Sequence, residues 1–366
     1  MSRQGSSRPR GESRGRAVEI RVRKWEGLPS LKELFKAYYE LDPPLVLPQD
    51  MARREFAFQP FDIESYVRHL SFGSEADLRA YLRSRPPRQA YHSVAIYQLP
   101  EAPSMEEKGW LGSEILLDID LDHYDFCQGV IDDRCLERGF EEARKAAKII
   151  RKATGGRALI YFTGHRGFHV RVKCDDCLQL GKDERRELAK FVRAEGLDLS
   201  LIFPRAGPYR PSKPSPQDPG WRGLIAELYG DAIEGDDWLR SLRSARLGVD
   251  IDSMVTEDPS RLTRIPGTLN GKGALLVAPL CEGEAFKPGK WLSPFHGEAE
   301  CRAVKSLDQT KILGYSVGFS EGEELSLPSG LALFLWLLGY VEIEGGTFVV
   351  RDNTGWWPVQ GCDWTP

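Results

Sequence analysis

The sequence predicts an α+β fold, a mixed core in which strands and helices follow one another without regular alternation. Two observations predict it. Strand-like runs rich in β-branched and aromatic residues are separated by helical patterns at uneven spacing, which disfavours a doubly wound parallel sheet. A proline-rich stretch at residues 204–220 lies inside a longer helical region at residues 178–247, which predicts a helical insertion in the core.

The first part of the chain combines helices with pairs of strands. Apolar residues at helical spacing predict a helix over residues 29–39, and several prolines follow it. Ser74 is a favourable N-cap for a second helix over residues 74–83. Strand patterns occur at residues 54–58, 66–72, 91–97 and 113–121. We expect the first two of these strands to form a hairpin.

The second part begins with a strongly amphipathic pattern, which predicts a long helix over residues 135–153 that ends at a Gly-Gly pair. Further elements are expected at residues 158–162 and 168–172 (two strands), 183–193 (a helix), 247–277 (a strand pattern) and 320–366 (a small helix-plus-hairpin element). The chain is thus divided into a tail at residues 1–24, a core domain at 25–319 and the terminal element at 320–366.

Charge is distributed unevenly along the chain. The net charge of −4 excludes an overall basic field of the kind that marks a histone-like binder. Within residues 1–24, however, eight Arg and Lys residues stand against two Glu, with Gly and Ser between them. Such a segment buries little apolar surface, so we expect a disordered tail. A nucleic-acid arm and a plain solubilising tail fit this composition equally well.

Composition also bears on the compartment. No apolar signal segment follows the first Met, and the longest apolar run, at residues 331–340, is too short to span a bilayer. We therefore expect a cytoplasmic protein with no membrane contact. Its seven Cys are odd in number and do not suggest a disulfide framework, so thiols or a metal site are expected. The pair Cys174 and Cys177 has finger-like spacing without a second pair nearby, which favours a surface turn.

The strand pattern at residues 115–123 carries an acidic residue at every second position. Asp118, Asp120 and Asp122 therefore point to one face, and the apolar residues between them point to the other. Carboxylates this close repel each other unless a cation lies between them, and Mg²⁺ or Mn²⁺ is the simplest candidate. A solvated edge strand or a cap for the next segment explains such a motif equally well when it stands alone.

Two more polar motifs follow. The turn between the strands at 158–162 and 168–172 contains two Gly together with Thr163, His165 and Arg166, and His169 comes soon after it. These side chains supply donors that suit phosphate oxygens. An ordinary turn with a surface Arg would show the same residue pattern.

The second of these motifs begins with an acidic pair, Asp250 and Asp252. Arg261, Arg264 and Lys272 follow it on a Gly-rich path. Acids that suit a metal and cations that suit phosphate thus recur together, which indicates a nucleotide triphosphate between them.

The order of these motifs resembles the archaeo-eukaryotic primase superfamily, and most closely the small, catalytic subunit of archaeal DNA primase. Flanking segments agree: residues 54–58 (REFAF) resemble the family's REFGF, 67–72 (VRHLSF) its RHLSF, and 108–112 its KGWLG. The resemblance covers residues 27–280. It implies a two-part primase catalytic core, in which the acidic residues are carried by strands and the helical insertion contributes no known site residue.

The resemblance assigns roles residue by residue. It makes Asp118, Asp120 and Asp252 the catalytic carboxylates that bind Mg²⁺ or Mn²⁺. Contacts to the incoming nucleotide are implied for Thr163, His165, Arg166, His169, Arg264, Asn270 and Lys272. Glu55 and Arg68 are implied as supporting residues. Such a site performs two-metal nucleotidyl transfer, in which cations offset the charge that grows on the phosphoryl oxygens.

The sequence departs from the family pattern at three places. Thr163 and His165 replace a Ser and a basic or small residue, and Asn270 replaces a His. The family's zinc knob normally has a Cys followed by a CxxC. The residues that remain for a degenerate zinc site are His123, Cys127 and Cys135, with Asp132 in place of another ligand. We therefore expect structural Zn²⁺ to be absent rather than present.

The function implied by the resemblance is synthesis of short RNA primers on single-stranded DNA during DNA replication, at the nucleoid, with DNA primers as an open alternative. Nucleoside triphosphates and a primase large subunit, forming a heterodimer, are the implied partners, and the helical insertion at 178–247 is the expected docking surface. Alternatives are a plasmid-type primase-polymerase or a template-dependent repair polymerase of the same superfamily, a non-enzymatic template-binding scaffold subunit, and a metal-dependent nuclease.

Overall fold

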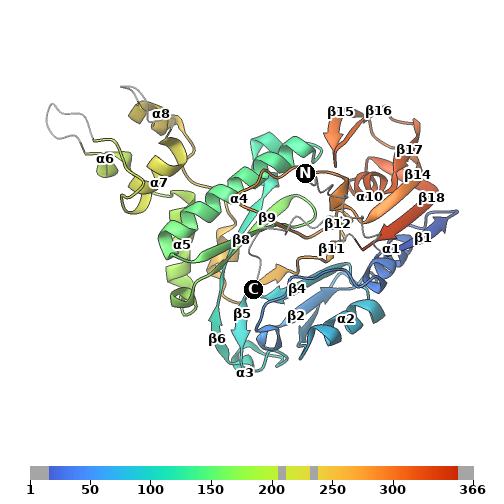
Figure 1. The fold of residues 1–366 in the computed structure, drawn as a ribbon, viewed down its shortest axis with the longest axis horizontal. Helices are drawn as coiled ribbons and strands as arrows, with labels where there is room; N and C mark the ends of the chain where they lie inside the picture. Colours follow the sequence, from blue (N-terminus) through green and yellow to red (C-terminus); the bar gives the residue numbers. More distant parts are fainter. Residues whose placement is uncertain (1–15, 205–211, 231–237, 353–366) are drawn as a thin grey trace, which may run out of the picture.

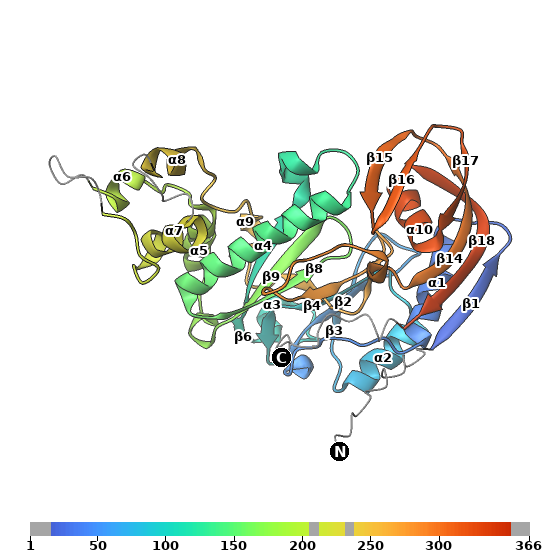
Figure 2. The ribbon, with the colours of Figure 1, turned by 45° about the horizontal axis from the view of Figure 1, so that its top comes forward.

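A computed structural model describes residues 16–204, 212–230 and 238–352 of the chain. Helices and antiparallel sheets are mixed, as the sequence predicts (Figure 1). Two four-stranded sheets form the centre, the helical insertion extends from one end, and a third sheet lies at the other (Figures 1 and 2). No helix within the described residues is long and apolar enough to cross a membrane.

The first central sheet has the strand order β13-β8-β9-β7, and all its neighbours are antiparallel. Its strands are β7 (Ile115–Asp120), β8 (Arg157–Phe162), β9 (Gly167–Lys173) and β13 (Ala278–Leu280). Helix α4 (Asp133–Thr154) packs against β8 and β9 with its apolar side. The predicted helix over residues 135–153 and the two strands that follow it are confirmed.

The second central sheet has the order β10-β4-β2-β3. Its strands are β2 (Phe56–Gln59), β3 (Val67–Leu70), β4 (Gln89–Ser93) and β10 (Leu262–Arg264). β2 and β3 form the predicted hairpin. Helices α1 (Leu28–Glu40) and α2 (Glu75–Ser84) pack against each other beside this sheet, and the Ser74 hydroxyl caps α2 by accepting a hydrogen bond from the Asp77 amide.

Short elements lie along the chain between these longer helices and strands. They are β5 (Ala95–Tyr97), α3 (Met105–Lys108), β6 (Trp110–Ser113), α9 (Ser253–Glu257), β11 (Leu269–Asn270), β12 (Leu275–Leu276) and 3₁₀ turns at Met51–Arg53, Leu121–His123, Asp125–Cys127, Asp175–Cys177 and Lys290–Leu292. The strand pattern expected over residues 247–277 is therefore interrupted, because α9 occupies its start and tight turns separate the short strands that follow.

The third sheet corrects the predicted ends of the core domain. Its order is β1-β18-β14-β17, from β1 (Ala17–Val22), β18 (Val341–Arg351), β14 (Phe295–Ala303) and β17 (Glu324–Pro328). Helix α10 (Ser329–Leu337) and the hairpin of β15 (Leu307–Ile312) and β16 (Tyr315–Phe319) accompany it. The terminal unit thus begins near residue 295 rather than 320. It is not a helix plus hairpin, because β17 and β18 lie on either side of β14.

The tail prediction was also wrong for residues 17–22, which form β1 and pair with β18. Val18, Ile20 and Val22 alternate with exposed residues and pack against the hydrophobic core. The charged residues of this strand, Glu19 and Arg21, lie on its exposed face. The rest of the predicted tail, residues 1–15, lies outside the described residues.

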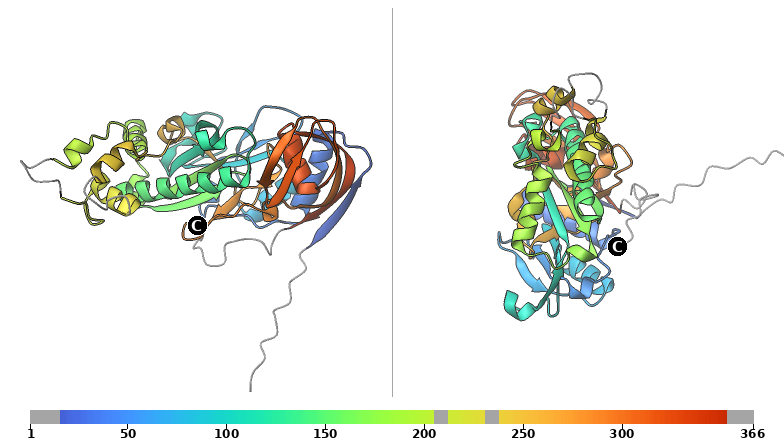
Figure 3. Two further views of the ribbon diagram at one scale, coloured as in Figure 1. Left: turned by 90° about the horizontal axis from the view of Figure 1, so that it is seen from above. Right: turned by 90° about the vertical axis from the view of Figure 1, so that its left-hand side faces the viewer.

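The insertion is helical, as predicted. It contains α5 (Lys182–Arg193), α6 (Leu199–Ile202), α7 (Gly220–Tyr229) and α8 (Trp238–Ser244), while residues 205–211 and 231–237 lie outside the described part. Helices α5 and α7 pack against α4. Figure 3 shows that the insertion continues the long axis of the molecule, far from the third sheet.

The cysteine prediction needs correction as well. Disulfide bonds join Cys127 to Cys135 and Cys174 to Cys177, and Cys301 is a buried free thiol. The first bond forms because the chain reverses between the 3₁₀ turn at Asp125–Cys127 and the first turn of α4. The two sulfurs that were candidate zinc ligands are therefore bonded to each other.

The packing of α4 on the first sheet depends on Gly139. A Cβ atom at this position would lie 2.6 Å from Leu121 and 2.8 Å from Phe168, and both of these side chains are fully buried. Because Leu121 directly follows the end of β7, this contact also sets the position of the chain next to Asp120. The helix has to lie this close for the acidic end of β7 to be held in place.

We predict that Gly139→Ala destabilises the protein although alanine is the better helix former. Overpacking costs about 1–3 kcal/mol, whereas helix propensity returns up to ~1 kcal/mol. Thermal and chemical denaturation measure the difference. Gly283→Ala is the control, since no atom lies within 4 Å of its added Cβ, and its effect should stay within about 0.5 kcal/mol. A Gly139→Ala variant more stable than the parent would contradict this packing.

Candidate active site

Three carboxylates from distant parts of the sequence meet at the end of β7. Asp118 and Asp120 lie on β7, and Asp252 is the N-cap of α9. The backbone amide of Asp252 donates a hydrogen bond to the backbone carbonyl of Asp118 at 2.9 Å. The structure therefore brings together the three residues that the sequence singled out, although their catalytic role stays a prediction.

Mutual repulsion marks this carboxylate cluster. Burial raises the pKa of Asp118 to about 7, and the charges of Asp120 and Asp252 add to the effect. Asp120 accepts a hydrogen bond from the Asp122 amide at 3.1 Å, and Asp252 accepts one from the Met254 amide at 2.9 Å. Within the described ranges, no three His, Cys, Asp or Glu side chains are already arranged as ligands of one metal ion. The carboxylates of Asp120 and Asp252 are therefore turned toward backbone amides.

His169 lies directly opposite Asp118 on the neighbouring strand β9. Its Nε2 atom is 3.5 Å from Asp118 Oδ1. Burial, together with the nearby charge of Arg264, lowers the pKa of His169 to about 3. The imidazole is therefore neutral at physiological pH and can offer one N–H group to the site.

The turn between β8 and β9 is held mainly by its own hydrogen bonds. The amide and the hydroxyl of Thr163 both donate to the carbonyl of Gly167 at 3.0 Å. Arg166 pairs with Asp122, so it is anchored beside the acidic strand. Burial lowers the pKa of His165 to about 4, with the charge of Lys272 as the next cause. His165 is therefore a neutral group close to a cation.

Asn270 has a structural task that differs from the predicted nucleotide contact. It is 1% exposed, its amide donates to the Thr163 carbonyl at 2.7 Å, and its oxygen accepts from Gln89 and from the Lys272 amide. Gly164 adopts φ +81°, and an added Cβ would lie 2.7 Å from the Asn270 Cβ. Asn270 thus joins the turn to the loop that carries Lys272 rather than facing a ligand.

Arg264 and Lys272 supply positive charge opposite the carboxylates. The charge of Arg264 lowers the pKa of Asp118 and of both His165 and His169, so it lies within reach of each. Its guanidinium is held by Gln89 and lies 5.0 Å from the ring centre of Tyr91. Lys272 is exposed at the rim.

A cluster of ionised side chains surrounds Glu55, the residue directly before β2. Glu55 is fully buried, with Arg68 Nε at 2.9 Å and Lys108 Nζ at 3.3 Å from its carboxylate. Burial alone would raise the pKa of Glu55, but the hydrogen bond and charge of Arg68 and the charge of Lys108 hold it below its ordinary value. Glu55 and Arg68 thus pair with each other, and their supporting role in the site stays a prediction. Lys108, itself fully buried, is a member of the cluster that the sequence reasoning missed.

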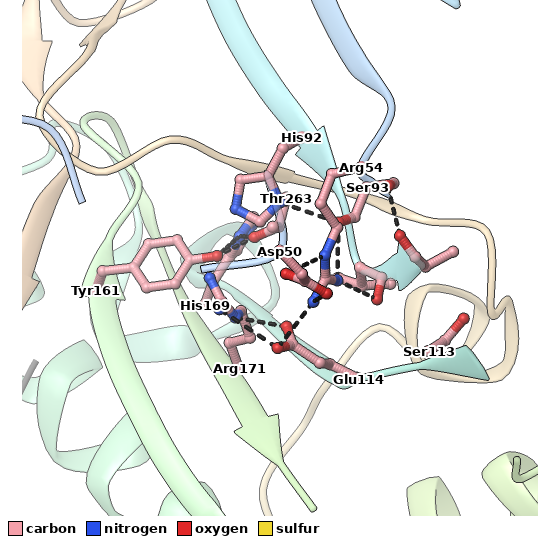
Figure 4. Close-up of polar contacts among 12 residues, drawn as sticks. Asp50, Arg54, His92, Ser93, Ser113, Glu114, Tyr161, His169, Arg171 and Thr263 are labelled. Carbon is pink, nitrogen blue, oxygen red and sulfur yellow. Dashed lines mark hydrogen bonds and ion pairs between the residues drawn. The ribbon is translucent and has the colours of Figure 1, made fainter. Parts of the chain in front are cut away.

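A second buried network was also missed, and it joins the two central sheets (Figure 4). Arg54 precedes β2 and donates to Glu114 at 3.2 Å, and Arg171 on β9 lies 2.6 Å from the other oxygen of Glu114. All three side chains are at most 6% exposed. Arg171 stands between Val170 and Val172 in an apolar strand, which is the sequence signal that could have revealed a buried ion pair.

An α+β core in which clustered carboxylates face fixed cations is typical of metal-dependent nucleotidyltransferases. The family model described as DNA primase small subunit matches residues 117–281. The chain is 48% identical to the DNA primase small subunit of Aeropyrum pernix over 90% of this chain and 97% of that one. It is 35% identical to the same protein of Sulfolobus acidocaldarius, over 85% and 94%.

The chain belongs to the DNA primase small subunit family, which confirms the resemblance seen in the sequence and the primase class of enzyme. The designation small subunit implies a larger partner subunit. Among solved structures, the polymerase domain of Mycobacterium tuberculosis Ligase D in complex with DNA is similar over 70% of this chain and 81% of that chain, with a TM-score of 0.38 and 10% identity.

We predict that Glu55→Gln destabilises the protein by about 3 kcal/mol at pH 7, because it leaves Lys108 buried without a counter-charge. The direction in which this stabilisation changes with pH follows from the lowered pKa of Glu55. Its stabilisation is present above the ordinary value of 4.5 and is lost as the pH falls through the lower folded value.

Denaturant unfolding of both proteins from pH 7 down to pH ~3 measures this effect, and the difference between them should shrink at acid pH. Glu64→Gln is the matched control, because the Glu64 side chain is 87% exposed and its ion pair with Arg88 should contribute at most ~1 kcal/mol. A constant difference across the range would show that the charge of Glu55 is not what stabilises the cluster.

Proposed function

We propose that this chain is the primase subunit that adds nucleotides, building short RNA primers on single-stranded DNA. The observation that carries the proposal is the meeting of Asp118, Asp120 and Asp252 opposite Arg264 and Lys272. Asp120 and Asp252 each accept a hydrogen bond from a backbone amide, but holding three carboxylates together costs free energy through repulsion. Their presence beside cationic side chains therefore supports a catalytic rather than a scaffold role. The family membership supports the same conclusion.

A divalent metal fits this donor set. Asp118, Asp120 and Asp252 offer the hard oxygen ligands that Mg²⁺ and Mn²⁺ prefer. Burial is the main cause of the raised pKa of Asp118, and the charges of Asp120 and Asp252, which a cation would offset, are the next. When bound, such metals lower the pKa of an attacking 3′-hydroxyl and stabilise the pyrophosphate leaving group. The chain's own cations have a separate task, since Arg264, Lys272 and Arg166 would bind and orient the triphosphate.

The insertion is proposed as the surface that docks the large subunit in a heterodimer. It extends from the core and carries none of the predicted site residues (Figure 3). An open hollow of about 820 Å³ between α5, α6 and α8 supports this choice, with Leu199 and Leu242 among its lining residues. Leu201 nearby is 79% exposed, which is unusual for a leucine unless a partner covers it.

We predict that Asp120→Asn lowers primer synthesis by about 100- to 1,000-fold, since it removes a charge that acts directly on the reacting groups. Synthesis is measured on a single-stranded oligonucleotide with nucleoside triphosphates and Mg²⁺ or Mn²⁺. Without divalent metal, the melting temperature should stay equal or rise slightly, because one source of repulsion on Asp118 is gone.

Asp125→Asn is the control for this substitution. Asp125 is exposed in the 3₁₀ turn that follows the same strand and lies outside the carboxylate cluster. Its variant should retain parental synthesis. Undiminished synthesis by Asp120→Asn would remove the basis for the proposed function, whereas DNA cleavage by the parent without nucleotides would favour a nuclease.

We predict that Lys272→Ala raises the apparent KM for nucleoside triphosphates by about 10-fold or more, since a hydrogen bond to a charged group contributes roughly 1.5–3 kcal/mol. Steady-state extension of a primed template measures it. Lys36→Ala on α1, another exposed lysine far along the sequence from the site, should leave KM unchanged. An unaltered KM in Lys272→Ala would place the triphosphate elsewhere.

A further inference from the structure

Both ring nitrogens of His169 have polar neighbours. Figure 4 shows those on the Nδ1 side, which come from both central sheets. On one side, Nδ1 lies 3.1 Å from the Thr263 hydroxyl and 3.4 Å from the Tyr161 hydroxyl. These two hydroxyls are hydrogen-bonded to each other. On the other side, Nε2 faces Asp118. None of the family motifs identified in the sequence assigns a role to Tyr161 or Thr263.

The strand register explains why these groups meet. Asp118, His169 and Tyr161 are directly opposite one another on β7, β9 and β8, so their side chains project from the same face of the first sheet. Thr263 comes from β10, the edge strand of the second sheet. Thr263 is 0% and Tyr161 1% exposed, so water does not compete for their hydrogen bonds.

The number of N–H and O–H hydrogens available to His169, Thr263 and Tyr161 favours one tautomer of the His169 ring. A neutral imidazole carries one N–H, and each hydroxyl carries one O–H. In its ionised form, the form that would hold a metal, Asp118 can only accept, so a hydrogen on Nε2 gives a favourable contact, whereas a lone pair on Nε2 would face a negative oxygen. With the hydrogen on Nε2, Nδ1 is an acceptor. The Thr263 hydroxyl can then donate to Nδ1 while it accepts from Tyr161.

We propose that Tyr161 and Thr263 are positioning residues that hold His169 as the Nε2–H tautomer, with its single donor directed at Asp118 and the phosphate oxygens of an incoming nucleotide. The part that concerns the nucleotide rests on the proposed function. The part that concerns the tautomer does not. The orientation of the His169 ring, on the first sheet, therefore depends on where the second sheet places the Thr263 hydroxyl.

The tautomer can be observed directly. Long-range ¹H–¹⁵N correlation spectra of the full chain, labelled at its six histidines, distinguish Nε2–H from Nδ1–H rings, and His169→Gln identifies the signal of interest. At a pH above the pKa of Asp118, where its carboxylate is ionised, the parent should show His169 as the Nε2–H form. Thr263→Val, which keeps the shape and removes the hydroxyl, should shift the ring toward the Nδ1–H form, and Thr263→Ser should restore the parental pattern.

A matched control separates this effect from a general loss of packing. Thr256 is also fully buried, and its hydroxyl donates to the Leu116 carbonyl at 3.0 Å. Thr256→Val should lower stability as Thr263→Val does and leave the His169 signal unchanged. A parental His169 in the Nδ1–H form, or an unchanged Nε2–H signal in Thr263→Val, would overturn the proposal.

Kinetics then test the consequence for the reaction. Thr263→Val should lower kcat/KM for nucleotide addition by about 10-fold, the equivalent of one hydrogen bond, and Thr263→Ser should recover most of it. Tyr161→Phe should have the smaller effect, because its hydroxyl acts mainly through Thr263. If the chain adds no nucleotides, the spectra still decide the tautomer. If the tautomer differs, Asp120→Asn still tests the proposed function.

Discussion

Repulsion among three carboxylates is the constraint on which the rest of this structure depends. Asp118, Asp120 and Asp252 would separate if their backbones were free, so the fold has to hold them from both sides. The β7–β9 ladder fixes the first two, and the hydrogen bond from the Asp252 amide to the Asp118 carbonyl fixes the third. Arg264 offsets part of the charge. The negative charge that Arg264 does not offset would attract a divalent cation and, with it, a nucleotide.

Holding the two central sheets at a fixed distance is the next requirement, and buried polar groups meet it. Glu114 binds both Arg54 and Arg171, one from each side of the junction. Buried ion pairs add little net stability, because desolvation cancels most of the attraction. Their benefit here is geometric, since removing one partner leaves an uncompensated charge. The contact of Thr263 with His169 crosses the same junction next to the acidic strand β7.

Much of the core was predictable from the sequence, because periodicity and alternation report which face of an element is buried. The helix α4 and the acidic face of β7 follow from that rule. Contacts across sheets do not, so the hydroxyl pair at His169 and the disulfide at Cys127 were missed. Strand β1 was missed because residues 1–24 were judged by their high overall charge, and the alternation of Val18 and Ile20 with exposed residues was overlooked. Asn270 was misassigned, since a motif position does not reveal where its amide points.

The most direct measurement is anomalous diffraction from crystals that contain Mn²⁺ and a non-hydrolysable nucleoside triphosphate. The account predicts a manganese peak within coordinating distance of Asp118, Asp120 and Asp252, about 2.0–2.3 Å from carboxylate oxygens, with the triphosphate between it and Arg264. The carboxylates of Asp120 and Asp252 would first have to turn from the backbone amides they now face. A peak away from Asp252, or a nucleotide on another surface, would contradict the account.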